Sequence, residues 1–353
     1  MPPLPPTPPT IFTALIIGAG PAGLSAALTF ARGAHPALVF DSSTPRNAGV
    51  SHMHTVASRD HIAPAEFRAI SRRQIEERYS CIAFSGATIV KAARKMLGGG
   101  RGRGDGHGDG TGEKEGQSEY EGFEVTDDKG TTYLGRKIIL ATGSRDVLPP
   151  IEGYAQNWPQ HIYQCLACDG FEQRGVPNGV LDVGPHTAHM VGMAMRFDSR
   201  VTVLTNGPVP DDAAIRTQLR ICEAWGATLE TRRIKKLINN GPTHVEGVTV
   251  EFEEGETLTL GFIANRPPTV NRAQDLIEQL GLECVGQEMG GYVKIVNPMF
   301  NSTSVRGVFA AGDTMTPIKQ VAIAMADGLR AGEGAAIEVA AEKEEATMKE
   351  LGI

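Results

Sequence analysis

The sequence predicts an α/β protein that consists of two three-layer domains, one of which is interrupted in the chain by the other. Its 353 residues are more than one ordinary hydrophobic core accommodates. Two separate stretches alternate short apolar runs with helical patterns, which is typical of strand–helix–strand units around a parallel sheet. These stretches begin at Ala14 and at Val180, and the pattern changes once more after residue 266, where we expect the chain to finish its first domain.

The first domain is predicted over residues 11–148 and 266–353, and the central domain over residues 149–265. Proline pairs mark both junctions, at Pro149-Pro150 and at Pro267-Pro268. The expected elements of the first domain are strand Ala14–Ile17, helix Pro21–Ala31, strand Ala37–Phe40, a hairpin of Phe123–Val125 and Thr131–Tyr133, strand Lys137–Leu140 and a strand beginning at Val308. Those of the central domain are strand Val180–Val183, helix Ala188–Phe197 and strand Val201–Leu204.

Two segments are predicted to stay outside the packed domains. Residues 1–10 are proline-rich and lack the basic start and apolar middle of a signal peptide, so they are interpreted as a disordered tail. Residues 98–119 are glycine-rich and of low complexity, and such a composition buries too little apolar surface to order itself. We expect a flexible surface insertion between two strands.

The overall composition excludes several classes of function. The net charge is −7 and no long basic run occurs, which argues against a nucleic-acid partner, since such binding depends on clustered Lys and Arg. No apolar run approaches the roughly 18 residues of a membrane span, so no membrane association is expected. Five cysteines in so long a chain do not make a disulfide framework, and a reducing, cytoplasmic location is predicted.

A glycine-rich turn follows the first predicted strand. Gly18-Ala19-Gly20-Pro21-Ala22-Gly23 matches G-x-G-x-x-G and opens the predicted helix, an arrangement that places a pyrophosphate on the helix N-terminus. Asp41 ends the second strand, where a carboxylate can bind ribose hydroxyls. The motif leaves FAD and NAD as alternatives. A second turn at Gly312-Asp313 favours FAD, because a longer cofactor needs another anchoring turn.

A pair of cysteines carries the expected redox chemistry. Cys165 and Cys168 form a C-x-x-C, whose spacing closes a small disulfide ring and allows one thiol to act as a nucleophile. No second pair is present to complete a zinc site, so no metal site is predicted. Asp169 has two alternative roles: proton exchange with the thiol or the flavin, or formation of the turn before Gly170.

Over nearly its whole length the chain resembles the low-molecular-weight thioredoxin reductases. The matching segments are GAGPAG, the closure Ala141-Thr142-Gly143, CLACDG and GVFAAGD. The resemblance implies two Rossmann-like domains with the FAD domain split around the central one, FAD as the cofactor and a homodimer. It also implies that Cys168 lies nearer the flavin while Cys165 exchanges with the substrate. Motifs and resemblance together predict these cofactor-binding residues: Gly18, Gly20, Pro21, Ala22, Gly23, Asp41, Ser42, Arg46, Asn47, His54, Ala141, Thr142, Gly143, Gly312, Asp313, Lys319, Gln320 and Val321.

The central domain departs from the reductases at its own nucleotide turn. Val183 and Pro185 stand where the reductases have glycines, so a side chain obstructs a pyrophosphate and a backbone N–H donor is missing. Where the reductases carry a basic cluster for the 2′-phosphate of NADPH, this chain has Asp211 and Asp212, which repel a phosphate. NADPH is therefore predicted not to be used.

Electrons must then come from the substrate, and the chain is similar to the gliotoxin-type dithiol oxidases, fungal relatives that close disulfides in epidithiodiketopiperazine metabolites. The similarity lies in Arg46-Asn47-Ala48, in His52-Met53-His54 and in the segment Tyr163–Gly175 around the cysteines. One departure is Gln164, which stands where a histidine is expected and cannot act as a base.

Two histidines are candidates for that base. His52 and His54 alternate on one extended segment, so one of the two is expected to face the flavin and to take the thiol proton. The alternative is a structural role for either. His61 and His186 are interpreted as surface or structural residues.

The sequence thus predicts an enzyme with Cys165, Cys168, Asp169, His52 and His54 as catalytic residues. The predicted function is FAD-dependent oxidation of a small-molecule dithiol of the epidithiodiketopiperazine type, with O2 as electron acceptor and H2O2 as product. A first alternative is an NADPH-dependent reductase of thioredoxin or small disulfides, with thioredoxin as a partner only in that case. A second alternative is a flavoprotein that senses redox state without turnover.

Overall fold

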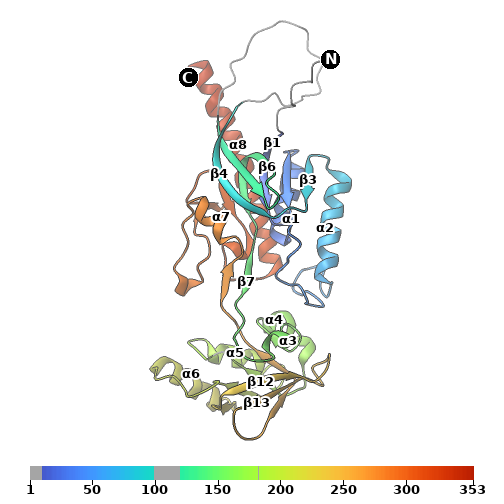
Figure 1. The fold of residues 1–353 in the computed structure, drawn as a ribbon, viewed down its shortest axis with the longest axis vertical. Helices are drawn as coiled ribbons and strands as arrows, with labels where there is room; N and C mark the ends of the chain where they lie inside the picture. Colours follow the sequence, from blue (N-terminus) through green and yellow to red (C-terminus); the bar gives the residue numbers. More distant parts are fainter. Residues whose placement is uncertain (1–9, 99–119, 182) are drawn as a thin grey trace. The chain divides into compact units, whose positions relative to one another are not determined.

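A computed structural model describes residues 10–98, 120–181 and 183–353 (Figure 1). The predicted tail and the predicted insertion lie outside these residues, except for Thr10 and Gly98, and so does Asp182 in the predicted strand Val180–Val183. The chain divides into two compact units. Unit 1 comprises residues 1–46, 65–145 and 270–353, and unit 2 comprises residues 47–64 and 146–269.

Unit 1 is built on a mixed sheet with a parallel centre. Among the described residues the strand order is β17–β18–β19–β6–β1–β2–β3, and β4 and β5 extend from β6 as an antiparallel ribbon. The strands are β1 (Ile11–Ile17), β2 (Ala37–Phe40), β3 (Ile82–Ser85), β4 (Ile89–Leu97), β5 (Tyr120–Asp127), β6 (Thr132–Leu140), β17 (Ile295–Asn297), β18 (Ser302–Thr303) and β19 (Val308–Ala310). The helices are α1 (Pro21–Arg32), α2 (Pro64–Arg78), α7 (Gln274–Gln279) and α8 (Val321–Leu351), with 3-10 turns η2 (Gln287–Met289) and η3 (Gly312–Thr314).

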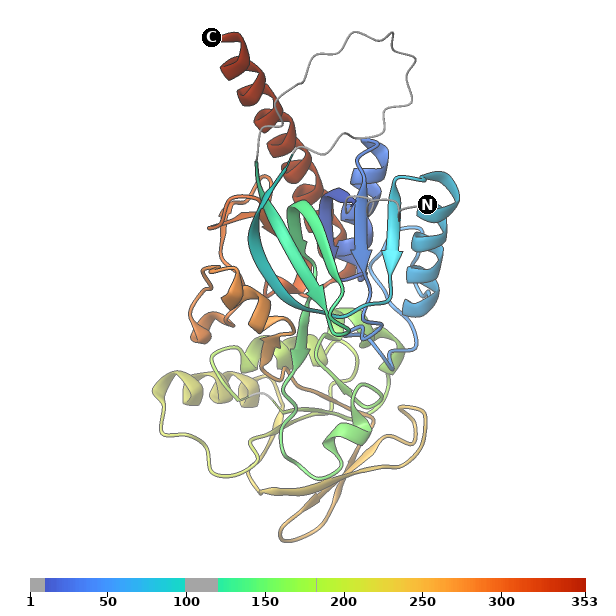
Figure 2. The same ribbon diagram turned by 45° about the horizontal axis from the view of Figure 1, so that its top comes forward.

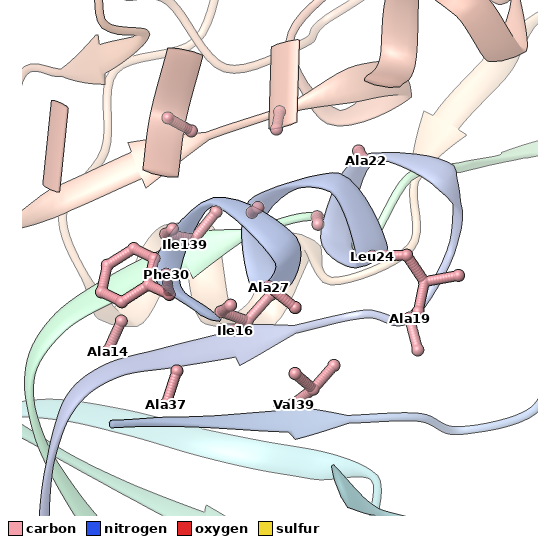
Figure 3. Close-up of a cluster of buried hydrophobic side chains, with 14 of the residues drawn as sticks. Ala14, Ile16, Ala19, Ala22, Leu24, Ala27, Phe30, Ala37, Val39 and Ile139 are labelled. Carbon is pink, nitrogen blue, oxygen red and sulfur yellow. The ribbon is translucent and has the colours of Figure 1, made fainter. Parts of the chain in front are cut away.

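The alternation of side chains along β1 produces three layers. Ala14 and Ile16 point to one face, where they join Phe30 of α1 and small residues of α8 in one buried cluster (Figure 3). Leu15 and Ile17 point to the other face, toward β4, β5 and α7. Each face of the parallel sheet is therefore covered, which explains why β1 and β2 consist almost wholly of apolar residues.

Helices α1 and α8 pack at very short range. A Cβ on Gly328 of α8 would lie 2.0 Å from the carbonyl oxygen of Ala22, so only a glycine allows this approach. The first turn of α1 is thereby held against α8, and both helices border the carboxyl edge of the sheet.

Strand β6 combines two elements that were predicted separately. Thr131–Tyr133 was expected in a hairpin and Lys137–Leu140 in a buried strand, and one continuous strand covers Thr132–Leu140. Its first part pairs with β5 and its last part lies between β1 and β19. Lys137 is buried on it, and its ammonium donates to Glu338 of α8 at 2.6 Å.

Unit 2 contains a parallel sheet in the order β11–β10–β9–β15–β8 and an antiparallel sheet β12–β13–β14 (Figure 2). Its strands are β8 (Ile162–Tyr163), β9 (Asn178–Val180), β10 (Val201–Leu204), β11 (Thr228–Glu230), β12 (Ile234–Asn239), β13 (Val248–Phe252), β14 (Leu258–Leu260) and β15 (Phe262–Ala264). Its helices are α3 (Tyr154–Asn157), α4 (Leu166–Asp169), α5 (Thr187–Ala194) and α6 (Ala213–Ala224), with a 3-10 turn η1 (Phe171–Gln173). Val191 of α5 and Leu219 of α6 are buried against the parallel sheet.

The chain leaves unit 1 through β7 (Ser144–Asp146) and returns through β16 (Thr269–Asn271), and these two short strands pair with each other. The structure differs from the predicted domain bounds in one further excursion, residues 47–64, which belong to unit 2. A bridge between Met53 and Ile62 folds this segment on itself, and Gly49 lies beside Pro159 of unit 2. No helix among the described residues is long and apolar enough to cross a membrane.

Candidate active site

The carboxyl ends of four parallel strands in unit 1 meet at one edge of the sheet. β1 ends before Gly18, β2 before Asp41, β6 before Ala141 and β19 before Gly312. Most of the predicted cofactor-binding residues follow these strand ends, so the fold brings them together at the position where open α/β sheets bind ligands. Asn47 and His54 are exceptions, because both belong to unit 2.

The glycine-rich turn has a different requirement at each of its glycines. Gly18 has φ +111° and a Cβ there would lie 2.3 Å from the carbonyl oxygen of Ala141, so this position accepts only glycine. At Gly23 a Cβ would lie 1.7 Å from the carbonyl oxygen of Gly18, and glycine here allows α1 to approach β1. At Gly20 a Cβ would meet nothing within 4 Å. Protein packing therefore does not explain Gly20, whereas the approach of a ligand to its backbone does.

Asp313 is the centre of a hydrogen-bonded group at the same edge. Its carboxylate lies 3.4 Å from the guanidinium of Arg46 and accepts from the Ser144 hydroxyl at 3.5 Å, and its backbone carbonyl accepts from Lys319 at 3.5 Å. Thr314 accepts a hydrogen bond from the Gly143 N–H at 2.8 Å. The two turns after β6 and β19 are thus tied to each other.

The cysteine pair lies in unit 2, in the turn that follows β8. Cys165 and Cys168 are joined as a disulfide, with their Cα atoms 5.2 Å apart. One turn of helix, α4, brings them together: the backbone N–H groups of Cys168 and Asp169 both donate to the carbonyl of Cys165, at 3.0 and 3.1 Å. Leu166 is buried and anchors this turn in the core of unit 2.

Asp169 has a strongly perturbed carboxyl group. Burial, and to a lesser degree the neighbouring carboxylate of Glu172, together raise its pKa from 3.8 to about 7. A carboxyl with such a pKa exchanges protons at neutral pH, which favours the proton-exchange role over that of a mere turn residue. Glu172 lies on η1, directly after the α4 turn.

The two predicted histidines, His52 and His54, both contact a third histidine ring, and which of them faces the flavin stays a prediction. His52 and His54 both contact the ring of His61, at centroid distances of 4.1 and 5.1 Å. Met53 between them is buried. The physical reason is the period of extended backbone, in which residues two apart share a face. His61, which was interpreted as a surface or structural residue, therefore contacts both predicted histidines.

The altered nucleotide turn of unit 2 is closed by its own side chains. The hydroxyl of Thr187 accepts from the Gly184 N–H at 2.8 Å and donates to the Gly184 carbonyl at 2.9 Å. The side-chain oxygen of Gln218 accepts from the Ala188 N–H at 3.2 Å. Val183 packs against the apolar core of the unit. Amides that would face a phosphate at the start of α5 thus already have protein acceptors.

Several residues of these sites escaped the sequence analysis. Glu172 and His61 carry no motif, and only their spatial neighbours reveal them. Thr187 was also given no role, because its hydroxyl bonds back to Gly184 instead of following a recognised capping pattern. Arg233 also escaped: its guanidinium carbon would lie 3.6 Å from a Cβ on Gly207, in the turn after β10.

Comparison with known proteins agrees with the fold and the disulfide. A family model for pyridine nucleotide-disulphide oxidoreductases matches residues 12–328. Thioredoxin reductase sirT of Leptosphaeria maculans is 38% identical over 340 residues, which cover 92% of this chain and 94% of that protein. Thioredoxin reductase tcpT of Claviceps purpurea is 38% identical over 337 residues, 94% of this chain and 95% of that protein. The crystal structure of an oxidoreductase from Agrobacterium tumefaciens superposes with a TM-score of 0.78 at 30% identity, covering 94% of this chain and 99% of that one.

The chain belongs to the pyridine nucleotide-disulphide oxidoreductase family. The predicted resemblance, the predicted fold class and the prediction of an oxidoreductase are confirmed. Family membership implies a flavin cofactor, FAD. Unit 1 fits this cofactor: Gly20 leaves open space beside the backbone, the start of α1 has no side-chain cap, and Asp41 and Asp313 follow β2 and β19 at the carboxyl edge of the same sheet.

Proposed function

We propose that this protein is an FAD-dependent oxidase of small-molecule dithiols, in which the Cys165–Cys168 pair forms the disulfide of an epidithiodiketopiperazine-type product and O2 accepts the electrons. The observation that carries the proposal is the closed turn before α5. There Thr187 and Gln218 engage amides that a nicotinamide dinucleotide would need, in a unit that also carries an intact disulfide. An enzyme that keeps the flavin fold and the disulfide without NADPH must draw its electrons from the thiols of its substrate.

The proposed reaction begins at Cys165. One thiolate of the substrate attacks its sulfur, the Cys165–Cys168 bond breaks, and Cys168 leaves as a thiolate. The second substrate thiolate attacks the mixed disulfide, which releases Cys165 as a thiolate and the product as a closed disulfide. The substrate loses two electrons and two protons, and the cysteine pair gains the electrons. The chemistry that bound FAD supplies is acceptance of these two electrons from the reduced pair and their delivery to O2, which leaves as H2O2.

Asp169 is the proposed proton carrier of this sequence. It is adjacent to Cys168, and its pKa of about 7 lets it take a proton from a thiol and release it to water at neutral pH. Gln164, which stands where a histidine was expected, does not titrate. Asp169 therefore supplies a base that the residue before Cys165 does not.

Three further features belong to the proposal. We infer a homodimer from the resemblance to the thioredoxin reductases. Cys81, Cys222 and Cys284 are free thiols, which supports a reducing, cytoplasmic setting. The substrate class rests on the similarity of the segments around His52 and Cys165 to the gliotoxin-type oxidases.

A second candidate function is an NADPH-dependent disulfide reductase. The names of the relatives at 38% identity support it, since both are thioredoxin reductases. Arg233 supports it as well, because its guanidinium beside Gly207 offers a positive charge near the turn where a 2′-phosphate would bind. A redox sensor without turnover is the third candidate.

Anaerobic flavin absorbance separates these candidates. One sample of FAD-loaded protein receives a small dithiol and another receives NADPH. We expect the dithiol alone to bleach the flavin, and we expect the colour to return when air is admitted, with one H2O2 formed per dithiol oxidised. Rapid bleaching by NADPH would instead establish the reductase, and slow reduction by either donor without turnover in air would establish the sensor.

Cys168→Ser tests the proposed reaction, and Cys222→Ser is its matched control. Cys222 is a buried free thiol of the same unit, and its loss should leave bleaching by the dithiol unchanged. Cys168→Ser should abolish it, since no disulfide remains to accept the substrate's electrons. Full turnover by Cys168→Ser would contradict the proposed reaction.

A further inference from the structure

Unit 2 contains a cluster of imidazole and carboxylate groups that the redox reaction does not require. His54, His61 and Glu172 each offer one ligand atom, and these three atoms lie within 4.8 Å of one another. Nε2 of His54 is 4.0 Å from a carboxylate oxygen of Glu172. Two of the residues come from the segment 47–64 and the third from η1, so the fold and not a sequence motif assembles them.

We propose that His54, His61 and Glu172 bind a divalent transition metal ion of the zinc class. Two histidines and one glutamate form the His2Glu ligand set in which zinc keeps an open fourth position. Binding requires the side chains of Glu172 and His61 to rotate toward His54, which their exposure permits, whereas His54 has only 12% of its side chain accessible. The prediction of no metal site is replaced by this proposal, since it considered only the cysteines.

Asp60 lies close enough to His54 to become the carboxylate that accepts from its other ring nitrogen when a metal binds. Nδ1 of His54 lies 4.0 Å from the Asp60 carboxylate, on the opposite side of the ring from Glu172. The backbone N–H of Thr55 donates to the same carboxylate oxygen at 2.8 Å and holds it in place. Such a carboxylate orients the ring and makes Nε2 the metal-binding nitrogen.

The backbone of the segment keeps His61 in position. His61 has φ +61°, in the left-handed region that a histidine adopts uncommonly, and Thr55 and Ser58 have φ +64° and +67°. The bridge between Met53 and Ile62 closes this loop next to His61. A preformed loop loses less entropy when an ion binds, which favours affinity.

The open fourth position suits a thiolate, and this step rests on the proposed function. Glu172 is four residues beyond Cys168 in the same unit, and zinc binds thiolate sulfur and holds it deprotonated. A substrate thiol bound there would be presented as the thiolate that attacks Cys165. The ion would thus supply activation that Gln164 cannot.

Metal binding is measured first, without reference to activity. FAD-loaded full-length protein is freed of metal with a chelator, and Co²⁺ and Zn²⁺ are titrated while Co²⁺ absorption and bound zinc are followed. We expect about one ion per chain. His54→Gln, His61→Asn and Glu172→Gln should each weaken binding more than about 100-fold, and Asp60→Asn about 10–100-fold. Asn tolerates the backbone of His61, so that variant keeps the loop.

His189→Ala is the control, because His189 is an exposed histidine of unit 2 outside the cluster. It should bind the ion as the wild type does. Binding that none of the cluster variants weakens, or that His189→Ala weakens equally, would overturn the metal site. Flavin absorbance and circular dichroism of every variant show whether it is folded.

The thiolate step is tested on the Cys165→Ser/Cys168→Ser variant, which cannot oxidise a dithiol. Adding a small dithiol to its Co²⁺ form should produce a sulfur-to-cobalt charge-transfer band. If the band is absent, the proposal that a substrate thiolate binds the metal is wrong, while the proposed metal site itself still stands. The proposed function fails in a different way. In that case the dithiol does not bleach the flavin of the wild-type protein, whether metal is present or not.

Discussion

Asp169 shows how one residue acquires its chemistry from its surroundings. It is the last residue of α4, and burial disfavours the ionised form of its carboxyl more than any other cause. Burial, followed by the negative charges of Asp169 and Glu172, also raises the pKa of Tyr163. Tyr163 therefore stays protonated at neutral pH, whereas Asp169 changes charge near pH 7.

The pH dependence of cysteine reduction tests this assignment. Ionised Asp169 is the base, and its fraction rises with pH through a pKa of about 7. We expect the rate of anaerobic flavin bleaching by a dithiol to rise about tenfold per pH unit below pH 7. Above pH 7 the rate should rise less steeply, because only the ionisation of the substrate thiol still increases with pH. Asp169→Asn should remove this inflection and slow bleaching at pH 8 by roughly 100-fold, a typical contribution of a general base.

Glu172→Gln is the companion variant, measured in metal-free protein. It removes the second cause of the raised pKa and leaves burial, so the inflection should move to lower pH but stay above 3.8. An inflection near pH 7 that persists in Asp169→Asn would assign the base to another residue.

The residues of the candidate site could be predicted where they belong to a local sequence motif. Cys165, Cys168 and Asp169 follow from C-x-x-C-D, and their geometry follows from one turn of helix. His61 and Glu172 could not be predicted, because they meet His54 only through a folded loop. Which of His52 and His54 faces the flavin stays a prediction, and the structure adds that both contact His61.

At the scale of elements, the turn between β1 and α1 contains one glycine that folding requires and another that only ligand binding requires. Gly23 is required by the packing of α1 on β1, whereas Gly20 has φ −72° and ψ −175°, which any residue adopts. Folding therefore does not require glycine at position 20. A bound pyrophosphate close to the backbone does.

Gly20→Ala and Gly23→Ala test this separation as a matched pair. Gly20→Ala should leave the melting temperature of the flavin-free protein unchanged and weaken FAD binding at least about tenfold, because its Cβ occupies the approach to the phosphates. Gly23→Ala should also destabilise the protein by about 1–3 kcal/mol or more, since its Cβ overlaps a backbone oxygen. Flavin content and thermal unfolding are the measurements. Wild-type FAD affinity in Gly20→Ala would place the pyrophosphate elsewhere.

The existence and type of elements were predictable, while their ends were set by contacts that a sequence does not display. The strand Val201–Leu204 was predicted with its observed bounds. The strand expected over Val180–Val183 ends at Val180, and the following helix starts at Thr187, whose hydroxyl closes the turn. The hairpin and the buried strand merged into β6 because one strand can pair on both edges.

At the scale of the whole molecule, long-range pairing decides which segments form a unit. β19, near the C-terminus, lies next to β6, and this contact completes unit 1 after the chain has passed through unit 2. The return of the chain was predictable from the second Gly-Asp turn at Gly312-Asp313. The excursion of residues 47–64 into unit 2 was not, because its polar, turn-rich sequence carries no periodicity.

The junction of β4 and β5 allows a test of what the segment between them contributes. Leu97 and Tyr120 are directly paired as the last residues of this ribbon, and Leu97 is buried, so the two strands align without any residue of the connection. Replacing residues 98–119 by Asn-Gly would close the ribbon with a two-residue turn of the type that fits antiparallel strands. We expect unchanged FAD content, a stability equal or higher by roughly 1–2 kcal/mol because a shorter loop costs less entropy to close, and unchanged oxygen consumption with a dithiol. Loss of oxidation in a variant that still binds FAD would instead give the segment a part in substrate or partner binding.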